Sequence, residues 1–196
     1  MTKSRHLTEQ KILHALEVLL LEQGYSAVGI NSLARQAGCD KVLIYRYFDG
    51  LDGLLLAFAE CTPLWWEIDE IITESGDEIG QHRLGQYLQL LLKRHVSALQ
   101  ARPLTLEIMA WEMSEQNNLT IALARTRSER GIALVKKVRA HFDQTNIDLG
   151  GMLGVFGAAI NYLLIRTRNA PPKHMTEEWW RLQHTISQLL ESYDRK

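Results

Sequence analysis

Apolar residues recur every three or four positions along nearly the whole chain, as they do on the buried face of an amphipathic α-helix. The alternation of apolar and polar residues that marks a β-strand does not occur in any convincing run. Glycine, proline and asparagine lie where the apolar stripes stop, at places where helices end or begin. The pattern therefore predicts an all-α protein with about nine or ten helices.

The N-terminal region contains three short apolar stripes. The first, from Ile12 to Leu20, is followed by Gly24, which can end a helix in a left-handed conformation. The second runs from Ile30 to Gly38, and Asp40 can cap a third helix directly after it. We therefore expect three short helices in residues 1–50 and treat this segment as a first domain, with 51–196 as a second.

The spacing of small and apolar residues in the second and third helices is that of a helix-turn-helix. Counted from Ile30, alanine stands at the fifth place (Ala34), where it lets the second helix approach its neighbours closely. Gly38 takes the turn at the ninth place, and Ile44, at the fifteenth, fills the space between the helices. Many helical hairpins share this spacing, so the pattern alone predicts the hairpin and not its role.

The third helix has more aromatic and basic residues than one buried face can use. With Ile44 and Phe48 turned inward, four side chains face other directions: Lys41, Val42, Tyr45 and Arg46. A lysine or a tyrosine hydroxyl can reach a phosphate, while a side chain near the helix start can meet base edges. The alternative is that Tyr45 and Tyr47 only fill the joint between two domains.

The segment "GYSAVGINSLARQAGCDKVLIYRYFDGLDGLLLAF", residues 24–58, resembles the DNA-binding region of TetR/AcrR-type transcriptional regulators. The resemblance rests on Gly-Tyr, Leu-Ala, Ala-Gly and Ile-Tyr-Arg-Tyr-Phe followed by Leu-Leu. It implies an N-terminal helix-turn-helix domain joined to a larger helical domain for ligand binding and dimerisation. It also implies that the residues touching operator DNA are Asn31, Lys41, Val42, Leu43, Tyr45, Arg46 and Tyr47.

Several positions depart from the family pattern. Gly29 stands where the family usually has a hydroxyl residue, and Leu51 replaces a frequent phosphate-contacting lysine. Val42 and Leu43 replace a pair of small residues such as Gly-Thr. Each change removes a polar contact, so the affinity of one subunit for DNA could be modest. A further hypothesis is that Val42 and Leu43 read thymine methyl groups.

The last two predicted helices, 149–168 and 176–194, have apolar and small-residue seams that suit another helix. The resemblance implies a homodimer through these helices, in line with readers that bind two half-sites of a palindrome. One chain could also satisfy both seams internally. The expected interface residues are Gly154, Ala158, Trp179, Leu182, Ile186, Leu189 and Tyr193.

Large aromatic residues and methionines between the two ends of the chain suit an adaptable apolar cavity for a small effector. They equally suit an ordinary core. The candidates for ligand binding are Trp65, Trp66, Tyr87, His95, Met109, Trp111, Met113, Phe156 and Tyr162. An effector can release DNA only by favouring a conformation with the wrong spacing of the two heads. The resulting expectation is a ligand-responsive regulator, a repressor in the simplest case.

Charge and composition change this picture little. The net charge is −1, with +2 on residues 1–47 and −3 on the remainder, a mild asymmetry that decides nothing by itself. The apolar run from Leu149 to Ile165 is short for a membrane span and contains Asn161, so we expect a buried helix. The N-terminus lacks the apolar stretch of a signal peptide, and a reducing cytoplasm suits the two cysteines, Cys39 and Cys61. A redox-sensing role for these cysteines stays open.

Catalysis finds little support in the sequence. The seven histidines show no metal-ligand spacing, the cysteines make no CxxC, and no P-loop, GxSxG or GxGxxG occurs. We therefore expect no enzyme activity, no metal and no cofactor. A rival interpretation is a helical adaptor that keeps the hairpin without DNA binding, which the departures at Gly29 and Leu51 favour. An enzyme would need a site assembled from distant residues.

Overall fold

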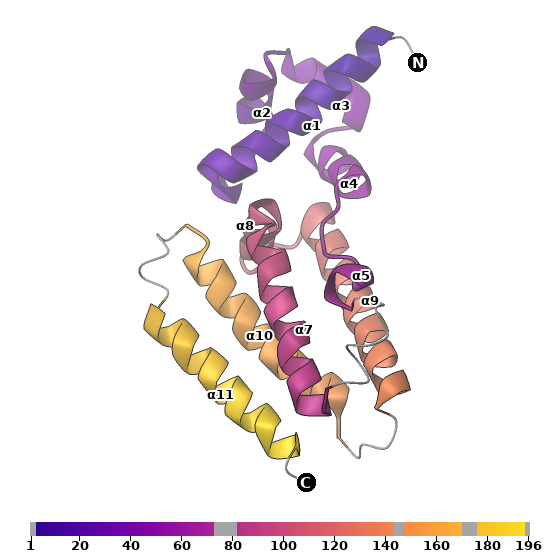
Figure 1. The fold of residues 1–196 in the computed structure, drawn as a ribbon. Coiled ribbons are helices and arrows are strands. Elements are labelled where there is room, and N and C mark those ends of the chain that lie inside the picture. Colours follow the sequence, from indigo (N-terminus) through magenta and orange to yellow (C-terminus); the bar gives the residue numbers. More distant parts are fainter. Residues whose placement is uncertain (1–2, 73–81, 143–146, 170–175, 195–196) are drawn as a thin grey trace. The chain divides into compact units, whose positions relative to one another are not determined.

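In a computed structural model the chain is described at residues 3–72, 82–142, 147–169 and 176–194 (Figure 1). These residues form helices and connecting segments without any β-strand, so the predicted all-α fold is confirmed. The sequence also predicts a polar break between helices from Glu74 to Gly80, and this segment lies outside the described residues.

The chain packs into two compact units. The first unit consists of Met1–Trp65 and Pro103–Thr126, and the second of Trp66–Arg102 and Arg127–Lys196. The first unit thus joins the N-terminal helices to a segment from the middle of the chain, which the sequence did not predict. The expected domain limits, 1–50 and 51–196, stay a prediction.

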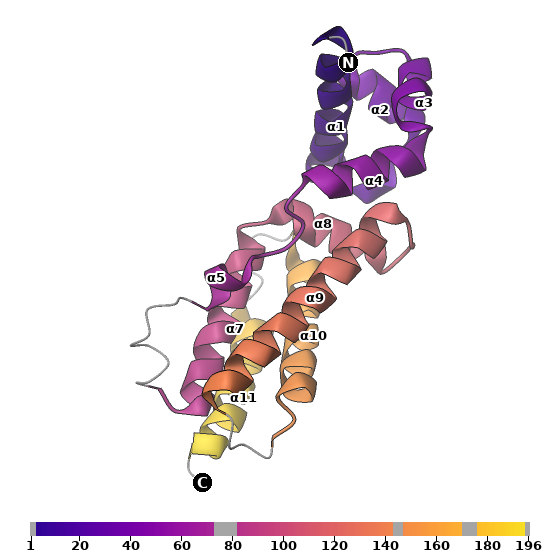
Figure 2. The ribbon, with the colours of Figure 1, turned by 90° about the vertical axis from the view of Figure 1, so that its right-hand side faces the viewer.

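The first unit is built around the N-terminal helices (Figures 1 and 2). Its elements are α1 (Lys3–Gln23), the 3₁₀ turn η1 (Tyr25–Ala27), α2 (Ile30–Ala37), α3 (Lys41–Phe48), α4 (Leu51–Cys61), α8 (Pro103–Glu112) and the beginning of α9 (Asn118–His141). α1 packs on α2, and α3 packs on both α2 and α4. Their shared core contains Ile12, Leu16, Leu33, Ile44 and Leu54, all with 0% exposure. The predicted apolar stripes are therefore the faces that pack together.

α8 is fastened to the end of α1 by three contacts of Tyr25. Its backbone N–H donates to Glu107 Oε1 at 3.0 Å, and its hydroxyl lies 2.9 Å from Ser114 Oγ. Its ring stacks on Trp111 with centroids 6.1 Å apart. Gly24 has φ 78°, and a Cβ there would lie 2.9 Å from Glu107 Oε1. The Gly-Tyr pair thus ends α1 and receives α8, a set of contacts that we call the Tyr25 latch.

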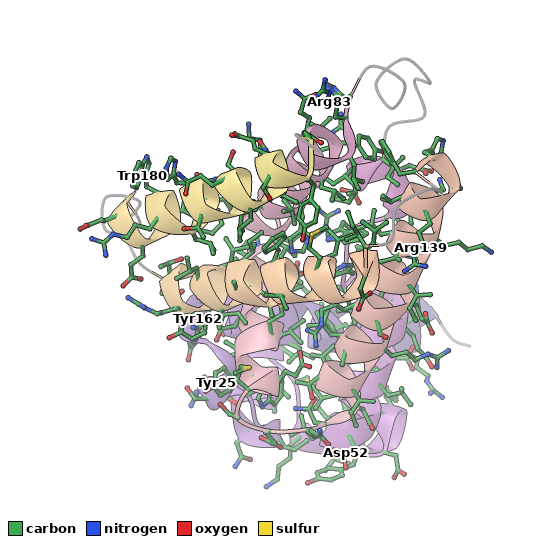
Figure 3. All side chains as sticks on the ribbon, turned by 90° about the horizontal axis from the view of Figure 1, so that it is seen from below. Tyr25, Asp52, Arg83, Arg139, Tyr162 and Trp180 are labelled. Atoms are coloured by element: carbon green, nitrogen blue, oxygen red, sulfur yellow. The ribbon has the colours of Figure 1, made fainter. Side chains whose placement is uncertain are left out.

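The second unit consists of α5 (Ile68–Ile71), α7 (Leu84–Gln100), the later turns of α9, α10 (Leu149–Thr167) and α11 (Thr176–Asp194). α10 and α11 run side by side, as Figure 3 shows, and α11 packs along α7. The carboxylate of Asp194 accepts hydrogen bonds from the backbone N–H groups of Gly85 and Gln86, at 2.7 and 3.1 Å. The end of α11 therefore caps the beginning of α7.

Candidate nucleic-acid interface

The turn between α2 and α3 has the geometry that the sequence predicts. Gly38 adopts the left-handed conformation, φ 62° and ψ 39°, at the end of α2. The N–H groups of Gly38 and Cys39 donate to the carbonyls of Arg35 and Ala34, at 3.2 and 3.0 Å. A residue with a Cβ would be strained at Gly38, so this glycine makes the sharp turn possible.

Asp40 begins α3 as expected. Its Oδ1 accepts the N–H of Val42 at 2.9 Å, which satisfies one of the free donors at the helix start. Ile44 is fully buried between the helices, and Phe48 is half-buried. This packing fixes the rotation of α3 about its own axis and so decides which side chains face outward.

The predicted DNA-contacting residues lie on or beside that outward face. Asn31, Lys41, Val42, Tyr45 and Arg46 are exposed, Val42 and Tyr45 by 52% and 55%. Leu43 and Tyr47 are half-buried. Within the described parts of the chain neither Lys41 nor Arg46 makes an ion pair, so both cations are available to an external anion. A solvent-exposed row of two apolar and two cationic groups suits a nucleic-acid groove.

The structure also shows the local surroundings of two positions that depart from the family pattern, Gly29 and Leu51. Gly29 is the N-cap of α2 and gives no side-chain cap. The nearby hydroxyl of Ser32 donates to the carbonyls of Ala27 and Gly29, at 2.6 and 2.9 Å, and stabilises the turn instead. Leu51, at the start of α4, is half-buried.

Sequence reasoning missed one cation beside this face, Arg5 of α1. Its guanidinium carbon lies 5.1 Å from the centroid of the Tyr47 ring. Through Tyr47, the aromatic cluster of α3 thus also contacts the beginning of α1. A pattern confined to residues 30–48 gives no signal for this contact.

The nine ligand-binding candidates are divided between the two units. Those of the first unit are Trp65, Met109, Trp111 and Met113, and those of the second are Trp66, Tyr87, His95, Phe156 and Tyr162. Seven of the nine are buried, whereas Met113 and Tyr162 are 74% and 57% exposed. Ligand binding by these residues stays a prediction.

The second unit contains a buried polar chain centred on His95. Trp66 Nε1–H donates to His95 Nδ1 at 2.9 Å, and His95 Nε2 lies 2.9 Å from Asn161 Oδ1. With Nδ1 as an acceptor, the neutral imidazole carries its proton on Nε2 and donates it to Asn161. Burial lowers the pKa of His95, and the hydrogen bond to Asn161 opposes that effect. His95 therefore joins the segment before α5 to α7 and α10 as a neutral group.

The second unit has a surface groove of about 350 Å³ between the start of α7 and the end of α11. Its lining is polar and consists of Arg83, Gln86, Gln89, Glu191 and Asp194. None of the predicted apolar ligand-binding residues lies in it.

The candidate dimer residues of α11 point to more than one side of that helix. Ile186 is buried within the chain, with 6% exposure, while Leu189 and Tyr193 are 49% and 38% exposed. Trp179 and Leu182 are half-buried. The predicted seam therefore lies partly against the chain's own helices and partly on its surface.

α10 differs from the sequence-based expectation of a buried helix. It has a mean hydropathy of 1.4 over its most apolar window, yet only 22% of that window is buried. Gly154 and Ala158 are exposed together with Val155 and Tyr162, which are 67% and 57% exposed (Figure 3 labels Tyr162). By length and composition α10 could cross a membrane, a property that core helices of water-soluble proteins share. The expectation of a buried helix is therefore wrong for a single chain, which leaves most of α10 uncovered.

Both cysteines are free thiols in the first unit, Cys39 half-buried and Cys61 exposed. Burial raises the pKa of Cys39, and the charge of Asp40 acts in the same direction, so its reactive thiolate form is disfavoured. Among the residues with a defined placement, no three His, Cys, Asp or Glu side chains converge as a metal site would need.

The N-terminal segment matches a known family in sequence. Residues 12–58 match "Bacterial regulatory proteins, tetR family". Two proteins of Mycobacterium tuberculosis, both named as HTH-type transcriptional regulators, are 36% identical to the chain over 52 residues. The match covers 26% of this chain and 26% of each relative, so it concerns about a quarter of the length on both sides.

Solved structures resemble the chain over nearly its whole length. NalD, the secondary repressor of the MexAB-OprM multidrug efflux pump in Pseudomonas aeruginosa, is 16% identical with a TM-score of 0.59, and the match covers 95% of this chain and 97% of NalD. A TetR family transcription regulator from Marinobacter aquaeolei is 15% identical with a TM-score of 0.50, over 96% and 97% of the two chains. At this identity the likeness shows a shared fold.

Proposed function

We propose that the chain, whose residues 12–58 match the tetR family of bacterial regulatory proteins, is a regulator of that type and binds a palindromic DNA operator as a homodimer. In this proposal the protein is a cytoplasmic transcriptional repressor. A small, largely apolar effector releases it from DNA.

The observation that carries the proposal is the outward face of α3. Packing of Ile44 fixes this face, and Lys41 and Arg46 stand on it without an ion-pairing partner among the described residues. Such cations replace condensed counterions on DNA and so supply affinity. In this proposal Val42, which is exposed and next to Lys41 at the helix start, meets base edges in the major groove.

Dimerisation is supported by the uncovered face of α10. Gly154 and Ala158 are exposed, and a Cβ built on Gly154 meets nothing within 4 Å. The chain's own packing therefore does not require a glycine there, whereas the close approach of a second helix would. We place the two-fold contact on α10 and on exposed Leu189 and Tyr193 of α11.

The effector part of the proposal rests on the core of the second unit. Trp66, Tyr87 and Phe156 are buried apolar groups, and His95 offers a neutral imidazole among them. An apolar molecule with one hydrogen-bonding group could replace Asn161 or Trp66 as a partner of His95. Any such ligand acts on DNA binding only through a difference in affinity between two conformations.

Selection of bound sequences from a random DNA pool with the purified protein tests the proposal. A palindromic consensus with half-sites about one helical turn apart supports both the reader and the dimer. Absence of enrichment, together with absence of salt-dependent binding to random duplex, would favour the helical adaptor. Enrichment of a single half-site would retain DNA reading and exclude the symmetric dimer.

A further inference from the structure

The guanidinium of Arg5 is held at two sides near the beginning of α1. Its Nε donates to Glu9 Oε1 at 2.7 Å, one helical turn further on. Its carbon lies 5.1 Å from the centroid of the Tyr47 ring on α3, within the range of a cation–π contact. The Arg5 side chain is nevertheless 41% exposed, while that of Glu9 is only 13% exposed. All three residues belong to the first unit.

These two contacts leave the outer end of the guanidinium unused. Arginine has five N–H donors, and only the one on Nε is engaged by Glu9. Across the described residues, neither terminal nitrogen of Arg5 donates a hydrogen bond. That end is the planar pair of nitrogens that matches two phosphate oxygens. Because its position is already fixed, little side-chain entropy remains to be lost on binding an anion.

The location of this free end matches the flank of a reading helix. Arg5 contacts the ring of Tyr47, and Tyr47 lies on the same helix, α3, as Lys41 and Arg46. A helix in the major groove has a phosphate backbone on either side, and contacts from neighbouring elements fix its orientation. The first turn of α1 contains no acidic residue, so the helix dipole adds positive potential there.

We infer that Arg5 is a DNA-phosphate contact outside the helix-turn-helix, and that Tyr47 and Glu9 position it. The inference rests on the proposed DNA-binding function. It changes the role of Tyr47, which was expected from the family resemblance to touch DNA. Its half-buried ring serves instead as the platform for a cation supplied by α1.

The test measures the salt dependence of binding to a short duplex of random sequence. The Arg5→Gln variant removes the charge, Arg5→Lys retains it, and Lys11→Gln removes an exposed charge elsewhere on α1 as a matched control. A plot of log affinity against log salt has a negative slope, and each lost phosphate contact makes it less steep by about 0.9, which is about 1.8 per dimer. Between about 50 and 200 mM salt, the wild-type protein would then lose about 12-fold more affinity than Arg5→Gln.

An unchanged slope in Arg5→Gln overturns the inference, even if the variant is less stable, because a purely structural role does not alter counterion release. Arg5→Lys and Lys11→Gln are expected to keep the wild-type slope. A less steep slope in Lys11→Gln would show that the salt dependence reflects the overall charge of α1 and not a specific contact of Arg5 with a phosphate. If the wild-type protein itself shows no salt-dependent binding, the proposed function fails, which is a distinct result.

The positioning role of Tyr47 is tested by a double-mutant cycle. Tyr47→Phe keeps the ring and should bind DNA like the wild-type protein. Tyr47→Leu removes the ring and should weaken binding of the wild-type chain but not of the Arg5→Gln chain. An equal loss in both backgrounds would mean that Tyr47 contacts DNA on its own account and would overturn this part of the inference.

Discussion

The outward faces of α3 and α10 both expose large apolar side chains, yet their surroundings differ. On α3, Val42 and Tyr45 are 52% and 55% exposed, beside Lys41 and Arg46. On α10, Val155 and Tyr162 are 67% and 57% exposed, and no charged residue occurs between Leu149 and Ile165. An exposed apolar group among cations suits a polyanion with apolar base edges, whereas one among glycines and alanines suits another protein surface.

The largest effect is expected from filling the small-residue face of α10. Gly154→Trp adds bulk where a Cβ meets nothing in the chain itself, so the monomer should fold while close approach of a second chain is blocked. Losing the second half-site contact should weaken operator binding by about 10²- to 10⁴-fold. Sedimentation equilibrium and DNA titration would measure the two consequences.

The control for this substitution is Gly131→Trp on α9, another glycine with open space around its Cβ position. It should leave both the mass and the affinity unchanged. A Gly154→Trp protein that remains dimeric would move the dimer contact away from α10. If the wild-type protein is monomeric at the concentrations at which it binds the operator, α10 is not a dimer face, and the proposed difference between the α3 and α10 faces is wrong.

The next effect concerns the attachment of α8 within the first unit, the unit that also contains α3. Glu107 is 6% exposed and accepts the N–H of Tyr25, so Glu107→Ala leaves that donor without its partner. The expected loss in the free energy of unfolding is about 1–3 kcal/mol. Urea unfolding followed by circular dichroism would measure it. Glu107→Gln keeps an oxygen acceptor and should lose less; an equal loss in both would show that the carboxylate charge, and not the Tyr25 hydrogen bond, matters.

The Tyr25 latch shows why two features of the first unit, the α3 face and the attachment of α8, are not equally predictable from sequence. Ala34, Gly38 and Ile44 lie within fifteen positions of Ile30, so the hairpin leaves a local pattern that can be read directly. Tyr25 and Glu107 are 82 residues apart, and no periodicity connects them. The sequence therefore predicted the α3 face but not the attachment of α8 to the same unit.

The seam of α11 failed to predict its partner for a different reason. A heptad-like spacing fits any neighbouring helix, whether it belongs to the same chain or to another. In the structure the chain's own packing takes Ile186, whereas Leu189 stays 49% exposed. For α10, the high apolarity predicts burial, but only 22% of its most apolar window is buried within one chain. Periodicity indicates that a face will be covered without saying by which chain.

Acid should affect the core behind α10 through His95. Burial, the larger cause, lowers the pKa of His95 in the folded protein, and the hydrogen bond to Asn161 only partly offsets it. Below the unfolded-state pKa of about 6.5, the unfolded chain binds more protons, so stability falls as the pH falls, by up to about 1.4 kcal/mol per pH unit. This loss stops once the pH drops below the folded-state pKa.

Urea unfolding at a series of pH values would measure this dependence. His95→Gln can still accept from Trp66 and donate to Asn161, and it should flatten the stability profile below about pH 6.5. His184→Gln, at an exposed histidine of the same unit, controls for the loss of one histidine. An unaltered profile in His95→Gln would show that His95 does not determine the acid sensitivity of this core.

The smallest effect distinguishes the residue that selects the base sequence from the residue that gives general affinity for DNA on the α3 face. Val42 is apolar, exposed and next to Lys41, so Val42→Ala should change which bases are preferred while Lys41→Gln should weaken binding to all sequences alike. Losing a methyl contact should reduce discrimination by about 1 kcal/mol, or roughly five-fold, at one position of each half-site. Selection with both variants compares them directly. A Val42→Ala protein with an unchanged consensus and only lower affinity would show that Val42 does not read a base, and would leave sequence choice on this face to Leu43, Tyr45 and Arg46.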